Sequence, residues 1–153
     1  VRSANNFGPN QYPEKVIPLF ITNLIEGKKV PLYAKGENVR DWLFVEDNCR
    51  AIDLVFRKGK EGEVYNIAAG NELRNIDLAR KLLTFFNKGE DAIQSVADRP
   101  GHDFRYSVNA AKLCALGFRL ESGFDEALSK TVSWYRANEA WWKPLKDNPF
   151  TKK

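Results

Sequence analysis

The stretch "VRDWLFVEDNCRAIDLVFRKGKEGEVYNIA", residues 39–68, decides the fold class of this chain. Its first part, 39–45, is dominated by branched and aromatic side chains and predicts a strand. Residues 46–59 begin with acidic side chains and end with two basic residues and a glycine, the charge order that favours a helix. Residues 62–68 predict a second, buried strand. A strand, a helix and a strand in this order indicate a mixed α/β protein.

The flanking sequence continues the alternation of short strands and helices. Apolar spacing and turn residues predict helices over 12–26, 75–86, 110–117 and 122–138, and strands over 29–33 and 92–96. The strands at 29–33 and 39–45 are separated only by the turn "AKGEN", so we predict that they form a hairpin. Residues 1–138 are expected to be one domain, followed by an aromatic, proline-containing tail over 139–153.

Composition narrows the function classes. The 153 residues are 43% hydrophobic, and 24 basic against 20 acidic side chains leave a net charge of only +4. The sequence has no basic stripe with interleaved aromatics, the pattern that indicates nucleic-acid binding. One histidine and two distant cysteines do not form a metal-ligand cluster. We expect Cys49 and Cys114 to face the core as thiols in a reducing compartment. Since no apolar run approaches 18 residues, we also expect a cytoplasmic protein without a membrane partner.

The polar segment "ADRPGHDFRYSVN", residues 97–109, contains the only histidine, His102. Arg99 in this segment and Arg40 in "VRDW" each stand beside an aspartate. The guanidinium fork matches phosphate oxygens, and the neighbouring carboxylate can orient it, so the two arginines suggest an anion clamp. Two surface salt bridges and a solvated histidine explain the same residues, and the spacing does not choose between these interpretations.

The remaining candidates are also ambiguous. The pair Asn5 and Asn6 before a Gly-Pro turn can bind a polar ligand or simply form the turn. Asn75 stands where a helix cap is expected. Lys15 and Tyr33 carry no signal of their own. The tail tryptophans, Trp134, Trp141 and Trp142, are expected to pack against the core or a partner.

The order of these motifs is more specific than any one of them. "NNFGPNQYPEK", then "VRDW", then "DRPGHD" resembles the C-terminal half of the dTDP-glucose 4,6-dehydratases, extended short-chain dehydrogenases/reductases that act on nucleotide sugars. The resemblance implies a homodimeric, NAD-dependent lyase that converts dTDP-glucose to dTDP-4-keto-6-deoxyglucose and water, a step toward rhamnose and other deoxysugars. It also implies that this chain is the substrate-binding part of that fold.

The resemblance assigns seven substrate-binding residues: Asn5 beside the sugar diphosphate, Lys15 and Tyr33 along the nucleotide, Arg40 and Arg99 on the diphosphate, His102 next to them, and Asn75 hydrogen-bonded to the nucleotide. The last assignment competes with the interpretation of Asn75 as a cap. The family usually has a serine directly before the asparagine pair, where this chain has Ala4.

Several motifs of the family are not found in this sequence. It has no glycine-rich NAD loop, no Tyr-x-x-x-Lys and no catalytic Asp-Glu pair; it has no methionine and begins at Val1. We therefore expect that an N-terminal half is missing, that the main NAD loop lies there, and that the chain is inactive alone. A UDP-sugar epimerase or decarboxylase of the same superfamily, or a non-catalytic binding domain, are the alternatives.

Overall fold

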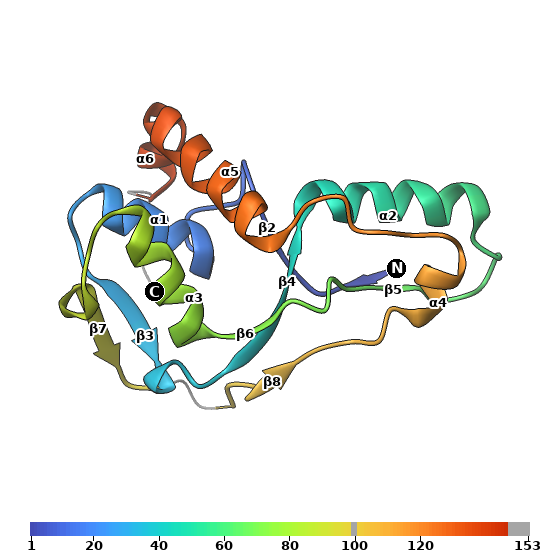
Figure 1. Ribbon diagram of the computed structural model, residues 1–153, viewed down its shortest axis with the longest axis horizontal. Helices are drawn as coiled ribbons and strands as arrows, with labels where there is room; N and C mark the ends of the chain where they lie inside the picture. Colours follow the sequence, from blue (N-terminus) through green and yellow to red (C-terminus); the bar gives the residue numbers. More distant parts are fainter. Residues whose placement is uncertain (99–100, 147–153) are drawn as a thin grey trace.

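The structure is a computed structural model that describes residues 1–98 and 101–146 (Figure 1). Its elements, in chain order, are β1 (Arg2–Ser3), β2 (Asn5–Phe7), α1 (Val16–Ile25), β3 (Val30–Tyr33), the 3-10 turn η1 (Ala34–Gly36), β4 (Val39–Phe44), α2 (Val45–Lys58), β5 (Asn66–Ile67), β6 (Glu72–Arg74), α3 (Asn75–Phe85), η2 (Glu90–Ala92), β7 (Ile93–Val96), β8 (Arg105–Tyr106), α4 (Ala111–Ala115), α5 (Phe124–Ala137) and α6 (Glu139–Lys146). The expected fold class, mixed α/β with short strands between helices, is confirmed.

Strand β4 has more strand partners than any other described strand. It pairs in parallel with β2, antiparallel with β6 and in parallel with β8. The predicted hairpin is wrong, because β3 pairs in parallel with β7 instead of with β4. The turn between them explains this difference: Ala34, Lys35 and Gly36 all have positive φ angles, and three successive left-handed residues direct β4 away from β3.

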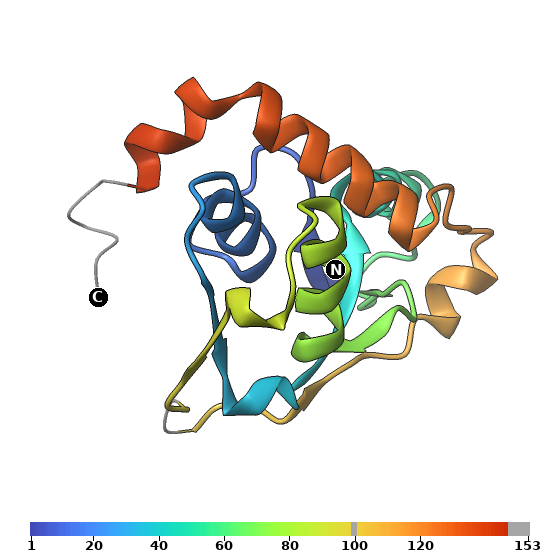
Figure 2. The same ribbon diagram turned by 60° about the vertical axis from the view of Figure 1, so that its left-hand side comes forward.

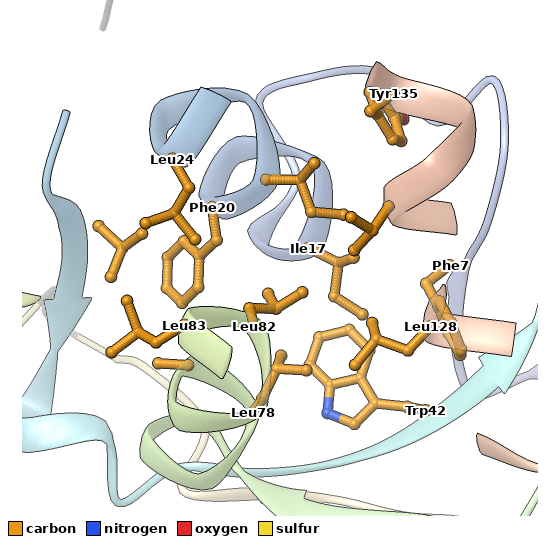
Figure 3. Packing of buried hydrophobic residues seen from close by; sticks show 14 of the residues in the cluster. Phe7, Ile17, Phe20, Leu24, Trp42, Leu78, Leu82, Leu83, Leu128 and Tyr135 are labelled. Atoms are coloured by element: carbon orange, nitrogen blue, oxygen red, sulfur yellow. The ribbon is translucent and has the colours of Figure 1, made fainter. Parts of the chain in front are cut away.

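Alternation along β4 connects two hydrophobic cores. Trp42 and Phe44 point into the larger core, where α1, α3 and α5 meet, while Leu43 points into a smaller one. Figure 3 shows Trp42 beside Leu128 of α5 in this larger core. The smaller core lies between α2, β5 and α4 and contains Ala4, Leu43, Ala51, Ile67, Leu113 and Phe118.

Helix α2 confirms the predicted helix but not the predicted thiol burial. The helix buries Asp47 and Ala51, which lie one turn apart on its inner side. Cys49 lies on another face and is exposed, and Cys114 is exposed on α4, so the expectation that both face the core is wrong. The strand predicted over 62–68 is reduced to β5, because Gly62 has a positive φ angle and the residues before Tyr65 are exposed.

The C-terminal helices close the larger core. In Figure 2, α5 and α6 arch over α1 and α3. Trp142 of α6 is fully buried, and its indole nitrogen donates a hydrogen bond to Tyr135 O at 2.8 Å. Trp134 packs edge-on against Trp141, with 5.1 Å between ring centroids. Packing against the core, as expected for these tryptophans, therefore holds for Trp142. No helix among residues 1–98 and 101–146 is long and apolar enough to cross a membrane.

Truncation of Leu82 tests the larger core. Leu82 is fully buried in α3, so Leu82→Ala should lower the free energy of unfolding by about 2–5 kcal/mol through lost burial and the remaining cavity. Leu120→Ala makes the same change at a side chain that is 39% exposed and should stay within about 0.5 kcal/mol of wild type. Urea unfolding measures both; equal losses in the two variants would contradict the assignment of this core.

Candidate functional site

Arg40 is held by backbone carbonyls. It is half-buried in β4, and its Nη2 donates to Asp103 O at 2.8 Å, while Nη1 donates to Val39 O at 2.7 Å and to Phe104 O at 3.4 Å. The expectation that Asp41 orients Arg40 is wrong. Alternate side chains of a strand point to opposite faces, and the buried Asp41 carboxylate instead accepts hydrogen bonds from Gly70 N and Asn71 N.

His102 lies in the segment that contacts Arg40, residues 101–104, which we call the His102 segment. Only 11% of the His102 side chain is exposed, and its Nδ1 is 2.8 Å from Asp98 Oδ1. The segment is joined to the start of β4 by the bond from Val39 N to Phe104 O at 2.8 Å. Arg99 lies outside the described residues. The structure therefore brings His102 and Arg40 to the same place.

Tyr33 and Asn75 border this group. Tyr33 ends β3 and pairs with Val96, two residues before Asp98. The turn that follows Tyr33 packs on the start of α3, since a Cβ at Gly36 would lie 2.8 Å from Ile76 N. Asn75 is the first residue of α3. It is buried, and it does not cap the helix, because no side-chain cap bond forms at this end. The capping interpretation is therefore not supported.

Asn5 approaches the group from β2. It pairs with Trp42, and the register of a parallel pair puts Asn5, Trp42 and Arg40 on one face of the sheet. Asn5 Oδ1 is buried and has no hydrogen-bond partner among the described residues, as is true of Asn6 Oδ1 and Asn75 Oδ1. A buried acceptor without a donor is costly, so these amides favour a ligand that supplies N–H or O–H donors.

Lys15 stands apart from the other candidates. It is exposed just before α1, and its ammonium group is 2.9 Å from Glu14 Oε1. Two hollows of the described surface, about 90 and 130 Å³ in volume, also lie away from Arg40: one is lined by Tyr12, Pro13, Glu14, Leu19, Leu145 and Lys146, the other by Leu24, Gly27, Lys28, Lys29, Lys88, Asp91 and Ala92. Both are smaller than the usual ligand pocket of roughly 300–1,000 Å³. None of the described candidate residues lines either hollow.

An ion-pair network holds β8 in place. Glu72 of β6 accepts hydrogen bonds from Arg105 Nε at 2.8 Å, from Arg105 Nη2 at 2.7 Å and from Ser107 Oγ at 2.7 Å. These donors, Arg105 first, lower the pKa of Glu72 from 4.5 to about 2. The sequence reasoning did not single out Glu72, because its partners lie over thirty residues away.

Asn38 is a second residue that sequence reasoning missed. Its side chain is only 2% exposed, and its Nδ2 donates to Asp103 O at 3.1 Å. A single asparagine two residues after a glycine in the turn "AKGEN" looks like an ordinary turn former. No local signal separates a buried asparagine from an exposed one in such a turn.

The described residues do not fit the main binding loop for NAD. A dinucleotide pyrophosphate binds at a glycine-rich turn between a strand and a helix, where backbone N–H groups are exposed. Here β4 leads directly into α2, whose first turn carries Glu46 and Asp47, and β6 leads into α3, whose first turn carries Asp77. These carboxylates repel phosphate. We therefore derive no chemical step through NAD from this chain.

Comparisons with known proteins identify the class. Residues 1–68 match the model of the NAD dependent epimerase/dehydratase family. The chain is 28% identical to a UDP-glucose 4-epimerase of Thermotoga maritima, with a TM-score of 0.83 over 90% of this chain and 45% of that one. It has the fold of the corresponding part of the extended short-chain dehydrogenases/reductases.

Within this class, the expected resemblance to dTDP-glucose 4,6-dehydratases is confirmed. The Streptomyces antibioticus enzyme of that name is 52% identical over 97% of this chain. The solved structure of the Bacillus anthracis enzyme, in complex with NAD, is 50% identical, with a TM-score of 0.90 over 94% of this chain and 46% of that one. The chain spans less than half, about 44%, of the length of the Streptomyces enzyme.

The Glu72 network gives a prediction of pH dependence. Glu72 has a pKa of about 2 in the folded state against 4.5 as its ordinary value, so its contribution to stability is complete above pH 4.5 and is lost as the pH falls toward 2. Glu72→Gln should therefore be less stable than wild type at pH 7, and the difference should shrink between pH 4.5 and 2. Urea unfolding across this range measures the difference; a gap that stays constant with pH would contradict the network.

Proposed function

We propose that this chain is the nucleotide-sugar-binding portion of a dTDP-glucose 4,6-dehydratase. The observation that carries the proposal is the guanidinium of Arg40, which is oriented by the carbonyls of Asp103 and Phe104 in the segment that contains His102. The carbonyls fix the direction in which the guanidinium points. An oriented cation of this kind suits a diphosphate.

The remaining residues are proposed to bind the rest of the ligand. Tyr33, at the end of β3, would offer its ring to the base, and Asn75 Oδ1 would accept a hydrogen bond from the nucleoside. Asn5 would face the sugar diphosphate from β2. Arg99, which the sequence places three residues before His102, would be the second arginine of the clamp. Lys15 is assigned to the nucleotide on the resemblance alone, since the described contacts tie it to Glu14.

The complete enzyme is proposed to convert dTDP-glucose to dTDP-4-keto-6-deoxyglucose and water as a homodimer with NAD. Support comes from the similar dehydratases, one of which is solved with NAD and another with NAD and a dTDP ligand. The contribution of this chain is to bind and orient the substrate. We further propose a cytoplasmic protein, which two exposed, unpaired thiols favour, because such thiols persist in a reducing compartment.

Two other functions have specific support. Similarity to the Thermotoga UDP-glucose 4-epimerase favours a UDP-sugar epimerase of the same class. The acidic side chains in the first turns of two helices, Glu46 in α2 and Asp77 in α3, favour a binding domain without catalytic activity of its own. The identity of the base separates the first alternative from the main proposal, and turnover of a complete protein separates the second.

Nucleotide titration tests the proposed site. The 153-residue chain should bind dTDP about fourfold more tightly than dUDP, which lacks only the thymine methyl group, if that group is buried, at about 0.8 kcal/mol per methylene-sized group. Arg40→Ala should weaken dTDP binding at least about tenfold, because a charge-assisted hydrogen bond is lost. Arg57→Ala, on an exposed arginine of α2, is the matched control and should bind like wild type. Isothermal titration calorimetry measures the affinities; a preference for UDP would support the epimerase instead.

A turnover assay tests the expectation that this chain binds the substrate but does not catalyse the reaction alone. The purified 153-residue chain, given dTDP-glucose and NAD, should form no detectable dTDP-4-keto-6-deoxyglucose, since the sequence lacks Tyr-x-x-x-Lys and the glycine-rich loop. The keto sugar can be followed by its absorbance in alkali. Turnover above the buffer control would show that this chain contains the catalytic groups and would overturn the assignment.

A further inference from the structure

We propose that Asn38 is a positioning residue that sets the place of the His102 segment relative to Arg40. The inference rests on the proposed function for its consequence in binding, but its structural part can be measured without a ligand. Asn38 precedes β4 and is 2% exposed. Burying an amide is unfavourable unless it forms hydrogen bonds. Asn38 Oδ1 has no partner among the described residues, so the side chain is held through Nδ2 and its partner.

That partner is a carbonyl which Arg40 also uses. Asp103 O accepts one hydrogen bond from Asn38 Nδ2 at 3.1 Å and another from Arg40 Nη2 at 2.8 Å. A carbonyl oxygen has two lone pairs, so the two donors fill its capacity. Asn38 therefore orients the same oxygen that orients the guanidinium, and a shift of this carbonyl would move Arg40 with it.

Asn38 also connects the segment to α3. Its backbone carbonyl accepts a hydrogen bond from Asn75 N at 3.0 Å. One residue thus joins three parts of the candidate site: the His102 segment through its side chain, β4 through the chain itself, and the start of α3 through its backbone. The adjacent bond from Val39 N to Phe104 O runs to the same segment, but any residue at position 39 other than proline could donate it.

Only the donor function of Asn38 requires an amide. Asn38→Asp keeps the shape of the side chain but has no N–H at neutral pH, and places a negative charge near Asp103 O. Asn38→Ala removes the donor and leaves space, while Asn38→Ser has nearly the volume of alanine and keeps one donor. If Asn38 merely filled space, loss of the donor in Asn38→Ala would leave the His102 segment and Arg40 in place; if it positions the segment, both would shift.

The single histidine provides a direct readout. His102 is the only histidine, so the imidazole C–H protons give one set of NMR signals that reports on the segment. We expect these signals to shift or broaden in Asn38→Ala and Asn38→Asp, and to shift less in Asn38→Ser. The indole N–H of Trp142, bonded to Tyr135 O, should stay unchanged and shows that the larger core is intact.

Binding of dTDP by calorimetry is the second measurement. Its dissociation constant should rise about tenfold in Asn38→Ala and Asn38→Asp and less in Asn38→Ser, the size of one lost hydrogen bond. Wild-type His102 signals together with wild-type affinity in folded Asn38→Asp would overturn the proposal. If Asn38→Asp does not fold, Asn38→Ala decides by the same two criteria, because it also lacks the donor. If wild type does not bind dTDP, the proposed function fails, while the His102 signals still decide whether Asn38 positions the segment.

Discussion

Most of this structure depends on the alternation of side chains along β4. Its odd-numbered residues, with Asp41 and Leu43, face one side, and its even-numbered residues, with Arg40 and Trp42, face the other. Leu43 enters the smaller core, and Asp41 anchors the backbone at Gly70 and Asn71. Trp42 enters the larger core, two residues from Arg40 in the candidate site. A shift of one residue in register would exchange these faces, burying the arginine's charge against Leu43's neighbours.

Two arginines on adjacent strands, β8 and β4, illustrate two uses of the same side chain. Arg105 forms a bidentate pair with Glu72, and this pair holds β8 in the sheet. Arg40, on the adjoining strand, is oriented by carbonyls of the His102 segment. In the first arrangement, the charge of Arg105 is paired with Glu72 and stabilises the fold. The second fixes the direction of the guanidinium through backbone carbonyls.

Local patterns predicted the elements well, and the pairings less well. The helix over 46–59 and the strand over 92–96 follow from spacing and charge within a few residues. The hairpin between 29–33 and 39–45 failed, because three successive positive φ angles in "AKGEN" and the partnership with β7 depend on distant sequence. The inward side of α2 was also misjudged at Cys49, since a helix with several apolar faces does not reveal which one is covered.

The candidate site, too, could be predicted from the sequence only in part. Motif order pointed to Arg40, His102 and Asn75; the described hydrogen bonds join Arg40 to the His102 segment directly and join Asn75 to it through Asn38. It could not show that Asp41 turns away from Arg40, or that Asn38 is buried, because both facts depend on tertiary contacts made by the 70–71 and 101–104 segments. Arg99 lies outside the described residues, and Lys15 is assigned to the site by resemblance only.

The partners of β4 also determine when the site can form as the chain is made. Arg40 and Asp103 are separated by 63 residues, and β6 lies between them in the sequence. Contacts at such separations require long loops to close, and they form late compared with helices. During synthesis β4 therefore emerges well before the His102 segment that orients its arginine. The bonds that orient Arg40 are absent from every nascent chain that ends before this segment.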